Sequence, residues 1–150
     1  MPATPQVLVT EGSTWSRSEA IGPFLITTAR FPAPDTIAPH THDRPCIACM
    51  LGGSFDLTFR HGKTYGCAPG TVAVEPAGET HCNCMGSAGA EVLVVQPDPG
   101  AGDLPTRASR ALEQPAQLRD PAISALGLRM AAELRRPDDL SDLTLEGLAL

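Results

Sequence analysis

The chain has 150 residues, and its formal net charge is -6. The 11 lysines and arginines are scattered along it, which argues against a nucleic-acid surface, because such surfaces cluster basic residues. No apolar run approaches the roughly 18 residues that a membrane helix needs, and no basic N-terminal region precedes an apolar segment. The sequence therefore predicts a cytoplasmic domain without membrane contact, in which the five cysteines are thiols.

Glycine and proline punctuate the first two thirds of the chain at short intervals, which is typical of many short strands. Apolar and β-branched runs predict strands at residues 6–10, 24–31, 54–60, 64–65, 71–75 and 91–96. Prolines keep the segment 36–51 extended. Turns are expected at 52–53, 61–63, 68–70 and 76–78. This density of strands predicts a barrel or a sandwich.

The composition changes after Pro97, and a proline- and glycine-rich segment at 98–105 is expected to lead into a helical tail. Asp120 followed by Pro121 is typical of a helix N-cap and first turn. Apolar residues at helical spacing predict a helix to about residue 136, and a second helix is expected over 141–150. Because this last pattern has no C-cap, we expect a chain that is cut short before a further domain. The alternative is a frayed natural terminus.

Three of the four histidines fall into one pattern. His40 and His42 are two residues apart on an extended segment, so both side chains should lie on one face. Cys46 would share that face unless Pro45 bends the chain, and a barrel would bring His81 beside the same segment. Imidazole and thiolate are metal ligands, so the sequence predicts a metal site here. The alternative is a histidine-lined pocket without metal.

At these positions the sequence resembles the cupin superfamily. The second cupin motif is matched in its spacing by Gly70, Pro76, Gly78 and His81. The first is matched by His40, His42 and Gly53. Three positions depart from the motifs: Pro34 replaces a glycine, Cys46 replaces the glutamate, and Met85 replaces an asparagine.

The resemblance implies a mainly β fold, namely a cupin jelly-roll barrel (1–105) followed by a C-terminal pair of α-helices (106–150). It also implies one divalent metal ion, held by His40, His42, Cys46 and His81. Because a thiolate is softer than a carboxylate, zinc is favoured, with iron, manganese and nickel as alternatives. Three imidazoles and one thiolate would complete a tetrahedral zinc site.

Other side chains near these motifs are assigned less central positions. Met50 and Met85 are expected in the core or the pocket wall. Cys82 and Cys84 should face away from His81, as ordinary strand thiols or, alternatively, as extra soft ligands or a redox-responsive pair. Buried, small apolar roles are expected for Cys49 and Cys67. Solvated turn positions are expected for Glu75 and Glu79, with an acid–base role as the alternative, and a surface position for His61.

A narrower resemblance is to the N-terminal sensor domain of AraC-type transcription regulators. It is carried by four motifs and a tail, at residues 40–45, 53–55, 65–72, 76–81 and 143–150. The resemblance implies a non-enzymatic domain that senses a metal or a small molecule and forms a homodimer. Contact with DNA would come only through a helix-turn-helix domain after residue 150. The alternative is a stand-alone metal-dependent cupin enzyme of the dioxygenase or isomerase class, in which the ion acts as Lewis acid or oxygen activator.

Overall fold

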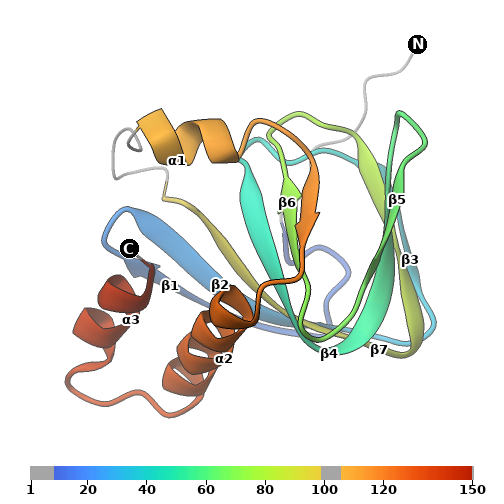
Figure 1. The fold of residues 1–150 in the computed structure, drawn as a ribbon. Coiled ribbons are helices and arrows are strands. Elements are labelled where there is room, and N and C mark those ends of the chain that lie inside the picture. Colours follow the sequence, from blue (N-terminus) through green and yellow to red (C-terminus); the bar gives the residue numbers. More distant parts are fainter. Residues whose placement is uncertain (1–8, 99–105, 150) are drawn as a thin grey trace.

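The computed structural model describes residues 9–98 and 106–149, and within these ranges the chain is mainly antiparallel β-structure with helices after it (Figure 1). The strands are β1 Trp15–Ile21, β2 Phe24–Phe31, β3 Thr36–His40, β4 Cys46–Phe59, β5 Thr64–Cys67, β6 Val72–Glu75, β7 His81–Pro97 and β8 Ala116–Leu118. The helices are α1 Thr106–Ala111, α2 Pro121–Arg135 and α3 Ser141–Ala149. The predicted fold class is confirmed.

The described strands form one sheet in the order β1-β2-β7-β4-β6-β8, with β3 also paired to β7 and β5 to β4. Strands β4 and β7 are the longest and pair with each other along most of their length. The sheet curves around a common interior, and α2 and α3 lie against its outer face (Figure 1). The site described below lies in that interior.

The predicted turn at residues 52–53 is wrong, because β4 continues through it. The register between β4 and β7 shifts on both sides of Gly53, which has a φ of 65°. A Cβ at Gly53 would collide with the backbone of Gly89 on β7. The absence of a side chain therefore lets two strands approach closely, and β4 bends there without ending.

Apolar side chains form two clusters on opposite faces of the sheet. One fills the barrel interior and includes Phe55, Leu57 and Phe59. The other lies between the sheet and the helices and includes Ile26, Leu93 and Leu134. Strand β7 serves both faces, since Val92 and Val94 belong to the first cluster and Leu93 to the second.

The predicted helix after Asp120 is confirmed. The Asp120 carboxylate accepts hydrogen bonds from the backbone amides of Ala122 (2.9 Å) and Ile123 (3.4 Å), and Pro121 occupies the first turn. Helix α2 buries Met130 and Leu134 against the sheet. None of the helices in the described ranges is long and apolar enough to cross a membrane.

Three described elements were not predicted: β1, α1 and β8. Strand β8 lies in the segment that was expected to be helical, yet it pairs with β6, with Ala116 opposite Val74 and Leu118 opposite Val72. Strand β7 begins at His81, ten residues before its predicted start at Glu91. The strand predicted at 6–10 lies partly outside the described residues, and Val9 and Thr10 form a turn. The predicted linker at 98–105 lies outside them after Asp98.

Candidate metal centre

Three buried histidines meet inside the barrel. His40 ends β3 and is the cross-strand partner of His81, which begins β7. His42 follows two residues later, where the chain passes towards β4. The ring centroids of the three imidazoles are 4.4–5.0 Å apart, and the side chains are almost fully buried. The predicted proximity of the two motifs is therefore confirmed.

Backbone contacts orient two of these rings. Nδ1 of His40 lies 2.7 Å from the carbonyl oxygen of Ala38, and Nδ1 of His81 lies 2.9 Å from that of Glu79. When Nδ1 donates its proton to such a carbonyl, Nε2 keeps a free lone pair. One ligand atom from each of the three imidazoles lies within 4.8 Å of the others. Histidines that bind metal usually make such a backbone contact through the ring nitrogen that does not ligate the ion.

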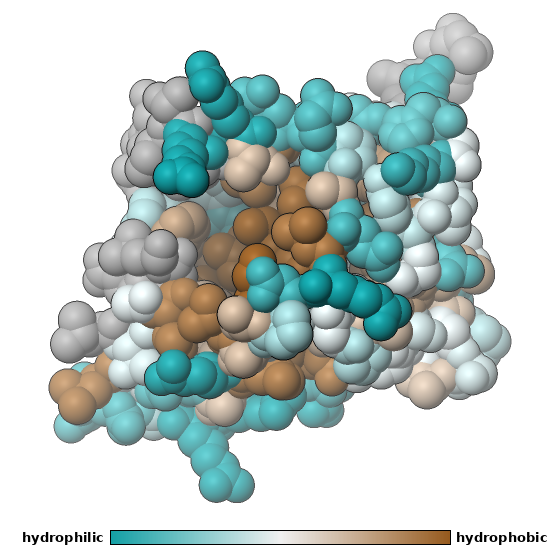
Figure 2. Space-filling model, viewed as in Figure 1, coloured by the Kyte–Doolittle hydropathy of each residue, from teal (hydrophilic) through white to brown (hydrophobic). Residues whose placement is uncertain are grey.

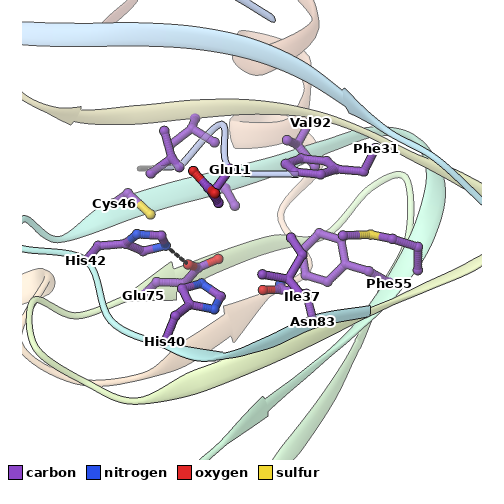
Figure 3. Close-up of a pocket in the computed structure, with 14 residues that line it drawn as sticks. Glu11, Phe31, Ile37, His40, His42, Cys46, Phe55, Glu75, Asn83 and Val92 are labelled. Carbon is purple, nitrogen blue, oxygen red and sulfur yellow. Dashed lines mark ion pairs between the residues drawn. The ribbon is translucent and has the colours of Figure 1, made fainter. Parts of the chain in front are cut away.

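Glu75 is buried beside the histidines, so the prediction of a solvated turn residue is wrong. It is the last residue of β6 and is 6% exposed. Its Oε2 lies 3.0 Å from Nε2 of His81 and 3.4 Å from Nε2 of His42 (Figure 3). Nothing local in the sequence marks this burial, because it arises from the pairing of β6 with β4, in which Glu75 lies opposite Cys46. Its alternative role, a chemical one near the pocket, is favoured by this position.

The buried charges shift one another. Burial opposes ionisation of Glu75, but His42 and His81 outweigh it and hold the pKa of this carboxyl far below its usual range. Burial likewise opposes protonation of His81, but Glu75 outweighs it and raises the pKa of that imidazole. Burial and the neighbouring imidazoles lower the pKa of His40. Without metal, the centre therefore favours an ionised Glu75 and makes His81 more basic and His40 less basic than a free imidazole.

A cavity of about 40 Å³ opens next to the imidazoles. A water needs at least about 10–15 Å³ of such space, so the cavity has room for roughly three waters, or for an ion or ligand of similar total size. The polar side chains in its wall are those of His40, His42, Glu75, Asn83 and Glu11 (Figure 3). Most of the remaining wall is apolar and includes Phe31, Phe55 and Val92.

Cys46 lines the same cavity and is 1% exposed. Burial raises the pKa of its thiol well above the usual value, and Glu75, to which the thiol hydrogen-bonds, raises it further. The thiolate form that metal ligation requires is therefore disfavoured in the metal-free protein. The role of Cys46 as a ligand stays a prediction.

The other residues assigned from the sequence are distributed around the centre. Met85 lines the cavity, whereas Met50 packs in the interior apolar cluster. Cys82 is half-buried and Cys84 is exposed, on the side of β7 that faces away from His81, as predicted. Cys49 and Cys67 are buried as expected, and burial raises the pKa of Cys67 to about 12. His61 is exposed, as predicted.

The residues present fit a divalent metal ion. Nε2 of His81 is buried and, among the described residues, has no well-directed hydrogen-bond partner, because the nearby Oε2 of Glu75 lies outside the hydrogen-bond direction. A buried polar nitrogen without such a partner is costly, and ligation would satisfy it. The three imidazoles would hold the ion, which would bring Lewis acidity and exchangeable positions for small ligands.

The comparisons with known proteins agree with the fold. The chain matches the family described as the AraC-like ligand binding domain over residues 22–150. No curated protein sequence matches it.

Solved structures of similar fold include KdgF from Halomonas sp., with 20% identity and a TM-score of 0.52, covering 63% of this chain and 86% of that one. A cupin 2 conserved barrel domain protein from Leptotrichia buccalis has 22% identity and a TM-score of 0.50, covering 61% and 44%. An oxalate decarboxylase variant from Bacillus subtilis has 19% identity and a TM-score of 0.50, covering 75% and 34%. The barrel is thus a cupin fold, and with the match over residues 22–150 the chain belongs to the AraC-like ligand-binding domain family.

Proposed function

We propose that this chain is the sensing and dimerising module of an AraC-type transcription regulator, and that its interior centre binds a divalent metal ion. The ion is itself the effector, or it anchors a small ligand in the adjoining cavity. The observation that carries the proposal is the triad His40, His42 and His81, buried in the ligand-binding cavity of a regulator family.

The size and lining of the cavity support a small effector. A space of about 40 Å³ accommodates an ion with a few waters or a molecule with very few heavy atoms. The apolar part of the wall would keep bulk water away from the ion. Polar contacts between the ion and its ligands are stronger in such surroundings than in water. Zinc, favoured from the sequence because of Cys46, stays a prediction.

The helical tail supports an output through assembly. Two large apolar side chains on one side of α2, Ile123 and Leu126, are exposed and line a hollow between the helix and the sheet. Figure 2 shows apolar side chains gathered in a hollow on this face of the molecule. An unpaired apolar surface of this kind suits a partner, and we propose a second copy of the chain. DNA contact would belong to a helix-turn-helix domain that is not among these 150 residues.

The test is metal binding and its effect on assembly. Metal-free protein is titrated with Zn²⁺, Ni²⁺, Mn²⁺ and Fe²⁺ under anaerobic conditions, and bound metal is counted by elemental mass spectrometry. We expect about one ion per chain, lost in His40→Ala and His81→Ala but retained in the control His61→Ala, whose histidine is exposed.

Sedimentation velocity with and without metal then tests the sensing step. An effector acts only through different affinities for two states, so metal must shift the monomer–dimer equilibrium. Equal metal content in the wild type and in the triad variants would refute the metal centre. An unchanged equilibrium in the loaded protein would refute dimer control by the ion.

The alternative is a metal-dependent enzyme. It is favoured by Glu11, whose carboxylate reaches the cavity opposite the histidines, where an acid or base would be needed (Figure 3). An enzyme would turn over a small substrate in the metal-loaded state and lose that turnover in Glu11→Gln without losing metal. A sensor would show neither effect.

A further inference from the structure

We propose that Glu75 is the carboxylate ligand of this metal centre, and that Cys46 acts as the residue that positions it. The proposal builds on the metal binding proposed above and identifies the fourth ligand. It replaces the predicted thiolate with a carboxylate that comes from a different strand. The sequence motif has its glutamate at position 46, on β4, whereas this chain carries one opposite it, on β6.

The strand register places the two positions side by side. Cys46 and Glu75 are direct cross-strand partners in the antiparallel pair of β4 and β6. Residues directly opposite each other in such a pair project from the same face, with Cβ atoms about 4.5–5.5 Å apart. A side chain at 75 therefore enters the same part of the barrel interior as one at 46. Both residues line the same cavity (Figure 3).

The distances around Glu75 are those of atoms that share one ion. Its Oε2 lies 3.0 Å from Nε2 of His81 and 3.4 Å from Nε2 of His42. Two ligand atoms about 2.1 Å from one ion are about 3.0 Å apart at a right angle and about 3.4 Å apart at the tetrahedral angle. Since Nε2 of His81 lacks a well-directed hydrogen bond among the described residues, its lone pair is available to an ion between them.

Burial of Glu75 adds a second argument. The carboxylate is 6% exposed inside a largely apolar barrel, and a buried carboxylate needs a compensating cation. Among the described residues that line this cavity there is no lysine or arginine, so apart from an ion only imidazoles could supply positive charge to Glu75. A divalent ion between Glu75 and the histidines supplies that charge.

Cys46 then has a different role from the one expected of it. Its thiol hydrogen-bonds to Glu75 and is surrounded by apolar residues of the interior cluster. A donor that fixes a ligating carboxylate is a common outer-shell arrangement at metal sites. The resulting set of three imidazoles and one carboxylate contains no soft ligand. It therefore suits iron, manganese and nickel as well as zinc.

The experiment compares four variants with the wild type, using Zn²⁺ and Co²⁺ affinities measured against a chromophoric chelator. The variants are Glu75→Gln, Cys46→Ala, the exchange Cys46→Glu with Glu75→Cys, and the control Glu79→Gln. The side chain of Glu79 acts on His81 through its charge, and its backbone carbonyl, which contacts Nδ1 of that ring, is kept in the variant; Glu79→Gln therefore reports the loss of a charge without the loss of a ligand. Far-ultraviolet circular dichroism shows which variants are folded.

We expect Glu75→Gln to weaken binding by more than about 100-fold, Cys46→Ala by about 10-fold, and Glu79→Gln by less than that. The exchange variant should recover most of the affinity, because the carboxylate then enters the same space from β4. If Glu75→Gln does not fold, the Co²⁺ spectrum of the wild type still decides between the carboxylate and the thiolate. The Co²⁺ form of the wild type should lack the near-ultraviolet thiolate charge-transfer band.

The assignment would be overturned if the wild type showed the thiolate charge-transfer band and if affinity were lost in Cys46→Ala but kept in Glu75→Gln. Cys46 would then be the ligand. In that outcome the triad still binds metal, so the proposed function stands. Failure of the wild type to bind any of the ions tested would instead remove the metal centre, and with it this assignment.

Discussion

Helix α2 rests on the barrel at a glycine, and this contact can be tested by adding one methyl group. Gly127 is buried in α2 where the helix meets β4. A Cβ at this position would collide with Sγ of Cys49 and lie 3.2 Å from its Cβ and 3.8 Å from Cδ2 of Leu93. The short Cys49 side chain is held between the sheet and the helix, so Gly127→Ala must push α2 away from β4.

The magnitude follows from two opposing effects. Overpacking a buried contact costs about 1–3 kcal/mol. Alanine in place of glycine inside a helix stabilises the folded state by about 1 kcal/mol through its higher helix propensity. We therefore expect a net loss of about 1 kcal/mol of unfolding free energy. Gly147 in α3 is the matched control, because it is exposed and a Cβ there would meet nothing within 4 Å. Gly147→Ala should gain up to about 1 kcal/mol.

Urea unfolding of the metal-free protein measures both variants. The same substitution in two helices should differ by about 2 kcal/mol, or roughly 4–8 °C in Tm for a chain of this size. Cys49→Ala removes the sulfur that Gly127→Ala would strike, so the double variant should show a favourable coupling of about 1 kcal/mol. If Gly127→Ala proved as stable as Gly147→Ala, the close seating of α2 on β4 would be refuted.

Three further outcomes are expected. Contact with Glu75 outweighs burial and raises the pKa of His81, so protons should compete with metal already above pH 6.5. Zinc titrations should therefore give a weaker affinity at each lower pH. A constant zinc affinity from about pH 8 to pH 6 would contradict this expectation. Asp120→Ala removes the cap of α2 and should cost about 1 kcal/mol by urea unfolding, whereas Asp120→Ser should restore most of it. Brief treatment of the native protein with iodoacetamide should label the exposed Cys84 and spare the three buried thiols, which are Cys46, Cys49 and Cys67. Mass spectrometry identifies the labelled residues. Labelling of a buried thiol at the rate of Cys84 would contradict the described packing.

Elements with a strong local pattern were predictable from the sequence. The strand at Phe24–Phe31 has an unbroken apolar and β-branched run between turn residues, and it matches β2. Helix α2 follows an aspartate cap and a proline at its first turn. The two histidine motifs could be placed together because their spacing resembles that of a family with a known arrangement. In each case a short stretch of sequence carries the information.

The remaining features depend on contacts between distant segments. Glu75 precedes Pro76, which suggests an exposed turn, and only the pairing of β6 with β4 turns its side chain into the barrel. The sequence offered one signal for this role. The motif glutamate is missing at position 46, so a carboxylate from another segment close to His81 could have been looked for. Strand β8 has three residues and no alternating pattern, so its existence follows from the free edge of β6 that it covers.

Strand β8 has a consequence for how a change at the proposed metal centre would reach the helices. Strand β6 ends in Glu75, inside the barrel, and its other edge is hydrogen-bonded to β8, with Val72 opposite Leu118. Two residues after Leu118 stands Asp120, the cap of α2. The carboxylate and the start of the helix are thus joined by one strand pair and a two-residue connection. In the proposed sensor, a movement of β6 would reach α2 through this short linkage, although 45 positions separate Glu75 from Asp120 in the sequence.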